Sequence, residues 1–114
     1  MSAVVLPTGF EALTPFVDYW ARPTTNERLA ARCEAPMTDI QAFYDAMLPL
    51  ARPAMALLDA TPLHAHTPPL ATLAQLVLSL AQAAVAVEMH GQPLSPNTPW
   101  PHSVRVPAGA APYA

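Results

Sequence analysis

The stretch from Pro68 to His90, PPLATLAQLVLSLAQAAVAVEMH, is bounded like one long helix and is apolar almost throughout. Thr67 followed by two prolines is typical of a helix start, because a proline at the first position lacks only an N–H that has no helical partner. Gly91 and Pro93 mark the end, since glycine readily adopts the left-handed conformation that closes a helix. Leucine, valine and alanine cover nearly all sides, which predicts a helix that is buried on most sides.

Uncharged polar residues form one narrow stripe along this helix: Thr72, Gln75, Ser79 and Gln82. We interpret this stripe as the side that faces water, and it is too narrow to keep the helix in solvent alone. We therefore predict that a second copy of the chain or a larger protein covers the flanking apolar residues, namely Leu73, Leu76, Val77, Leu80 and Val87. The length also meets the criterion for a membrane span, but no Lys, Arg, Trp or Tyr flanks it as an interfacial anchor, so we expect none.

The preceding segment, residues 38–60, has the pattern of an amphipathic helix that carries two prolines. Pro49 and Pro53 each remove a backbone hydrogen bond and clash with the turn before, at about 3 kcal/mol in a regular helix. We predict a kink or break near Leu48 to Pro53. The segment then lies antiparallel to the long helix, so that the two form a helical hairpin.

Short helices are expected before the hairpin, at about residues 15–21 and 25–35, the second with a capping box from Thr24 to Glu27. After Gly91 six prolines exclude regular helix and favour an extended arm. The prediction is an all-α protein: a small helical bundle built on the hairpin of residues 38–60 and 68–90. Residues 1–91 form its helical domain and residues 92–114 a proline-rich arm.

Composition excludes several classes of function. The 114 residues suffice for one domain, 53% are hydrophobic, and only 11% are charged. All five cations are arginines, so lysine Schiff-base chemistry and the lysine of a phosphate loop are excluded. A net charge of -3 without a basic run excludes a phosphate-backbone footprint, so we expect no nucleic-acid partner. The single Cys33 excludes an internal disulfide. The N-terminus has neither a cationic start nor a long apolar run, so we expect a cytoplasmic protein.

Histidines flank the long helix and raise the question of a metal site. His64 and His66 precede it, and Glu88 and His90 lie at its end. A helix of this length separates the two pairs by about 33 Å, so they cannot share an ion within one chain. An antiparallel dimer could bring them together, but a loop and a helix-end histidine explain them more simply. We expect no bound metal and no cofactor.

No nucleophile lies at a spacing that places a base beside it, so the sequence favours a protein without catalytic activity. We predict a non-catalytic interaction module or small accessory subunit that assembles through its apolar helix. The alternative is a small-molecule-binding protein or minor enzyme, with a pocket between the N-terminal segment and the kinked helix. Its lining, aromatic except for one methionine, would be Phe16, Tyr19, Trp20, Phe43, Tyr44 and Met47, with Arg22, Arg28 or His90 as polar anchors.

Overall fold

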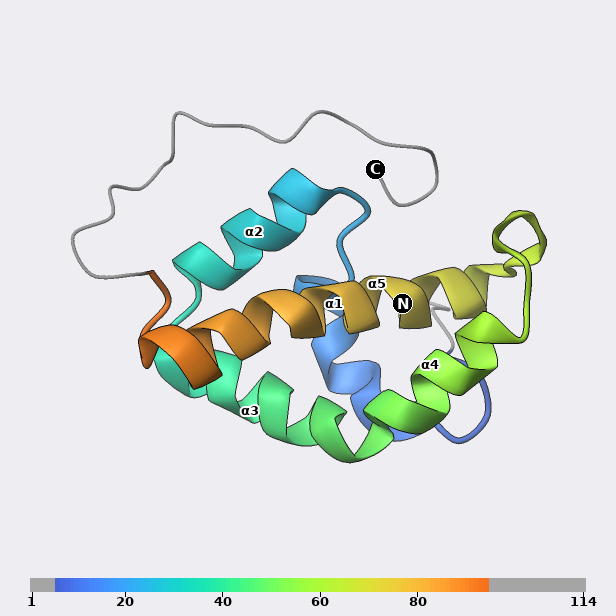
Figure 1. Cartoon of the computed structure of the whole chain (residues 1–114), viewed down its shortest axis with the longest axis horizontal. Helices are drawn as coiled ribbons and strands as arrows, with labels where there is room; N and C mark the ends of the chain where they lie inside the picture. Colours follow the sequence, from blue (N-terminus) through green and yellow to red (C-terminus); the bar gives the residue numbers. More distant parts are fainter. Residues whose placement is uncertain (1–5, 95–114) are drawn as a thin grey trace.

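Helix α5, Pro68–Ala84, is the element on which the other helices pack. The structure is a computed structural model and describes residues 6–94, so the predicted arm lies outside the described residues from position 95 onward. In Figure 1, α5 crosses the front of the molecule, with α2 above it and α3 and α4 below. Helix α1 contacts it from behind. The prediction of an all-α bundle is confirmed.

Short elements lead into the bundle, as the sequence predicts. They are the 3-10 helix η1 (Glu11–Phe16), α1 (Val17–Trp20) and α2 (Thr25–Glu34). The predicted cap of α2 is present, because the Thr24 hydroxyl oxygen accepts the backbone N–H of Glu27 at 3.1 Å. This bond fixes where α2 begins after Pro23, and α2 then packs against α5.

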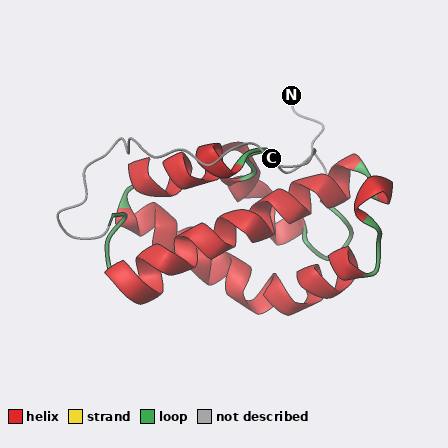
Figure 2. Cartoon of the chain, turned by 45° about the horizontal axis from the view of Figure 1, so that its top comes forward, coloured by secondary structure: helices red, strands yellow, loops and turns green. Residues whose placement is uncertain are grey.

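The two prolines divide the predicted kinked helix into two. Helix α3 (Met37–Met47) passes into a 3-10 turn, η2 (Leu48–Leu50), and then into α4 (Ala51–Asp59). Pro49 lies inside the turn, where its missing N–H cannot continue the α-helical ladder. Pro53 is the third residue of α4, within the first turn, where N–H groups have no helical partner. Figure 2 shows α3 and α4 as two limbs of a bend that follows α5, so the predicted break is confirmed.

The long helix ends where the sequence predicts, but not as a regular α-helix. After α5, residues Val85–His90 form a π-helical segment, η4. Gly91 closes it in the left-handed region at φ 67°, and its N–H donates to the Ala86 carbonyl at 2.7 Å. This bond spans five residues, one more than in an α-helix, and the apolar pattern contains no signal for it.

The polar stripe of α5 does not face water as a whole, which corrects the sequence interpretation. Ser79 has no exposed surface, and its hydroxyl donates to the Trp20 carbonyl at 2.5 Å. That carbonyl belongs to the last residue of α1 and also accepts the Arg22 N–H at 2.9 Å. The bond gives the buried Ser79 hydroxyl an acceptor at the end of another helix, so this polar residue does not need water.

Candidate functional site

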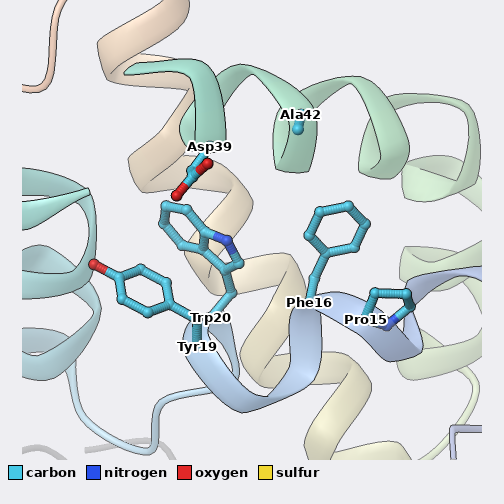
Figure 3. A pocket seen from close by; sticks show the side chains of 6 residues that line it. All are labelled: Pro15, Phe16, Tyr19, Trp20, Asp39 and Ala42. Atoms are coloured by element: carbon cyan, nitrogen blue, oxygen red, sulfur yellow. The ribbon is translucent and has the colours of Figure 1, made fainter. Parts of the chain in front are cut away.

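A hollow of about 260 Å³ opens between the N-terminal segment and α3. Three elements line it: Pro15 and Phe16 from η1, Tyr19 and Trp20 from α1, and Asp39 and Ala42 from α3. Figure 3 shows Phe16 and Pro15 on one side of it, Tyr19 on the other, and the Asp39 carboxylate close to the six-membered ring of Trp20. Asp39 is the only charged residue in this lining.

Stacked rings hold the apolar wall of the hollow in place. The Trp20 and Phe43 rings lie nearly parallel, with centroids 4.5 Å apart and an interplanar angle of 7°. Phe16 tilts against the same Phe43 ring at 5.7 Å. Phe43 has no exposed surface and Trp20 only 3%, so the two rings form a rigid base. The Tyr19 hydroxyl donates to the Ala31 carbonyl of α2 at 2.7 Å, which fixes the remaining ring.

The structure brings together only part of the aromatic set named from the sequence. Phe16, Tyr19 and Trp20 line the hollow, whereas Phe43 and Met47 are fully buried in the core behind it. Tyr44 points elsewhere, because its hydroxyl donates to the Glu88 carboxylate of η4. Sequence reasoning missed Asp39, since an acid in the first turn of a helix is already explained by the helix dipole.

Charges of both signs surround the Tyr19 hydroxyl. Burial raises the pKa of the Tyr19 hydroxyl, Arg22 acts in the opposite direction, and Glu34 and Asp39 raise it further. The Arg22 guanidinium carbon lies 4.9 Å from the Tyr19 ring centroid, and its Nε donates to the Tyr19 carbonyl at 2.6 Å. One guanidinium therefore already rests on an aromatic ring of this segment, with two carboxylates within electrostatic reach of the same hydroxyl.

The arginines named as ligand anchors instead connect helices. Arg28 is 4% exposed and donates to the Arg22 carbonyl at 2.7 Å and to the Thr25 hydroxyl at 3.3 Å. Burial lowers the pKa of Arg28, against the attraction of Glu27. Its bond to the Arg22 carbonyl joins α2 to the segment that follows α1. Neither Arg28 nor His90, at the far end of η4, lines the hollow.

The two pairs of candidate metal ligands lie at opposite ends of α5, as the length of the helix requires. His64 is in the short helix η3 (Leu63–Ala65), and the His66 ring nitrogen lies 3.2 Å from the Thr61 carbonyl. Glu88 binds the Tyr44 hydroxyl, and this hydrogen bond raises the pKa of that hydroxyl. His90 Nδ1 is buried without a hydrogen-bond partner among residues 6–94. Within that range no group of three or more His, Cys, Asp or Glu side chains could hold a metal ion.

The residues predicted to form the interface lie on the inner side of α5. Leu73 and Leu76 have no exposed surface, and Val77, Leu80 and Val87 pack against the same core. The opposite side of α5 and η4 carries half-buried and exposed residues, which we call the outer stripe: Ala71, Gln75, Leu78, Ala81, Gln82, Val85 and Met89. Together α5 and η4 are long and apolar enough to cross a membrane, a test that core helices of soluble proteins also pass.

Cys33 behaves as a small buried hydrophobe. It is 7% exposed, burial raises the pKa of its thiol, and the neighbouring Arg32 lowers it less strongly. Arg32 Nη2 lies 3.5 Å from the sulfur, while its Nε and Nη1 are buried without partners among the described residues. A thiol with a raised pKa is a poor nucleophile, because the thiolate is the reactive form.

Cys33 should therefore react slowly with a thiol reagent in the folded protein. We expect labelling by a disulfide reagent at pH 8 to be at least about tenfold slower in buffer than in 6 M urea, because the thiol must first become exposed. The chain has a single cysteine, so the absorbance change reports this site alone. Equal rates in buffer and urea would contradict the burial.

Comparison with known proteins finds no matching family model, no similar curated protein and no similar solved structure.

Proposed function

We propose that the protein is a non-catalytic interaction module that assembles with a second copy of itself through the outer stripe of α5. The observation that carries this proposal is the chemistry of the stripe. None of its seven residues is charged, five are apolar, Leu78 is 38% exposed and Met89 is 76% exposed. The outer face of a helix in a stable monomer is usually rich in charged and polar side chains.

The spacing of the outer stripe supports helix pairing. Positions 71, 75, 78, 82, 85 and 89 alternate steps of four and three, which is the spacing of a coiled-coil seam. All seven stripe residues are half-buried or exposed in the folded chain. The small side chains of Ala71 and Ala81 allow another helix to approach the stripe closely.

The two glutamines favour a second copy over an unrelated helix. In a parallel pair each seam residue meets its own counterpart, so Gln75 faces Gln75 and Gln82 faces Gln82 of the partner. Each amide can then donate to and accept from an identical amide, which satisfies polar groups that the interface buries. A register shift would place an amide against Leu78 or Val85 and leave it without a partner, at a cost of about 1–3 kcal/mol.

Light scattering tests the assembly. We expect the wild-type chain to be a dimer at tens of micromolar, and Leu78→Arg to be a folded monomer, because it buries a charge at the centre of the seam. Met55→Arg is the matched control, since Met55 is 45% exposed on α4, outside the stripe. It should leave the dimer intact.

Two outcomes would refute this proposal. One is a wild-type chain that is monomeric at this concentration and binds no hydrophobic dye, because its outer stripe would then be stable in water. The other is a chain that is folded only in detergent or lipid, which would make α5 a membrane helix.

A further inference from the structure

We infer that the hollow formed by Pro15, Phe16, Tyr19, Trp20, Asp39 and Ala42 binds a guanidinium group carried on a short apolar stem. This inference does not depend on the outer stripe, because no residue of α5 lines the hollow. It rests on the composition of the walls, on the single carboxylate and on the size of the space.

The walls and the carboxylate together select an organic cation. Proline and three aromatic rings favour an apolar body, and the half-buried Phe16 ring adds the attraction of an aromatic face for positive charge. The Asp39 side chain is exposed and forms no hydrogen bond with the described residues, so its oxygens remain available to a ligand. A neutral apolar ligand would remove water from this carboxylate without replacing it, which is unfavourable. An anion would be repelled.

A metal ion does not fit the same space. Calcium and magnesium take six or more oxygen ligands, and the lining offers one carboxylate among apolar side chains. A single positive charge with low hydration instead matches one carboxylate among apolar walls.

Guanidinium is the cation that matches this geometry best. It is planar, it stacks on aromatic faces, and its paired N–H groups can donate to both oxygens of one carboxylate. The Arg22 guanidinium on the Tyr19 ring shows the same contact within the chain. A volume of about 260 Å³ lies just below the range of drug-sized pockets, and it suits a group the size of one long side chain.

Binding can be measured on the full chain through the Trp20 indole N–H by NMR. A Trp100→Phe background leaves Trp20 as the single indole, because the chain has two tryptophans. The probe is n-butylguanidinium, and n-butylurea is its neutral counterpart of nearly the same shape. We expect the guanidinium to shift the indole resonance at millimolar concentration and to bind at least about tenfold more tightly than the urea.

Two variants test whether the Asp39 carboxylate supplies the negative charge that binds butylguanidinium. Asp39→Asn keeps the shape of the side chain and should weaken butylguanidinium binding by about tenfold or more. Asp18→Asn removes an exposed acid of α1 that does not line the hollow, and it should leave the affinity within about twofold. Both variants are expected to keep the far-UV circular dichroism of the parent.

A peptide probe then distinguishes the two possible sources of the guanidinium group. A Gly-Gly-Arg-Gly-Gly peptide that binds as tightly as butylguanidinium identifies an arginine of a protein partner as the source of the group. A peptide that binds more weakly identifies a free small molecule. The inference is wrong if butylurea binds as tightly as butylguanidinium, if Asp39→Asn leaves the affinity unchanged, or if no shift occurs at about 10 mM probe. None of these results depends on whether the chain is a dimer.

Discussion

Phe43→Ala is expected to lower the free energy of unfolding by about 3–5 kcal/mol. The Phe43 ring has no exposed surface and stacks on Trp20, with Phe16 tilted against it. Truncation removes the ring around which the other two are arranged and leaves a cavity that backbone shifts can only partly fill. Urea denaturation followed by far-UV circular dichroism gives the loss directly.

Phe16→Ala is the matched control for this substitution. The same atoms are removed from the same aromatic group, but Phe16 is only half-buried and lines the open side of the hollow. We expect its cost to be clearly smaller, because less apolar surface returns to water and water can fill the space left behind. An equal loss for the two variants, or a cost below about 1 kcal/mol for Phe43→Ala, would contradict the central position of the Phe43 ring.

The second large effect is expected on α5, where Leu76→Ala should cost about 2–5 kcal/mol. Leu76 has no exposed surface and belongs to the core that α5 shares with α1 and α3. The substitution should destabilise the folded chain itself, and a lower midpoint of urea denaturation at constant slope would show it.

Leu78→Ala, two residues further along the same helix, separates core from surface. Leu78 is 38% exposed on the outer stripe, so we expect its loss to change the stability of a single chain by less than about 1 kcal/mol. Its effect should fall on self-association, measured as the concentration at which the dimer dissociates. If Leu76→Ala weakens association but leaves the stability of one chain unchanged, α5 packs the other way round from the structure described above.

The boundaries of the helices follow from local chemistry, and the sequence therefore predicts them well. Thr24 begins α2 because its oxygen accepts an orphan N–H, and Gly91 ends η4 because it adopts a positive φ at no cost. Pro49 breaks the helix between α3 and α4 for an equally local reason. Each of these signals lies within about four residues of its effect.

The orientation of α5 depends on distant residues, and here the sequence pattern is misleading. Polar residues at spacings of three and four indicate a water-facing side only if no other part of the chain offers them a hydrogen-bond partner. Ser79 donates to the Trp20 carbonyl, 59 positions earlier in the chain. The outer stripe keeps Gln75 and Gln82 of the predicted polar stripe, but its most exposed large residues are Leu78 and Met89, which the sequence pattern alone would place in a core.

The candidate site was predictable in its aromatic part only. Phe16, Tyr19 and Trp20 are close in sequence and share a helical stretch, so a common surface follows from periodicity. Asp39 joins them because the chain reverses between α1 and α3, a tertiary arrangement that has no local signal. Tyr44 leaves the set for a related reason, since its partner Glu88 lies on another helix.

The helix on which the others pack is also the last of them to be synthesised. Translation delivers α1 to α4 before the codons of α5 are read, so Leu13, Ile40 and Phe43 at first lack the surface that later covers them. A nascent chain at this stage exposes apolar side chains of the kind that chaperones bind. The complete core can form only after α5 has left the ribosome, and a chain truncated before Pro68 keeps the aromatic cluster without the helix that covers it.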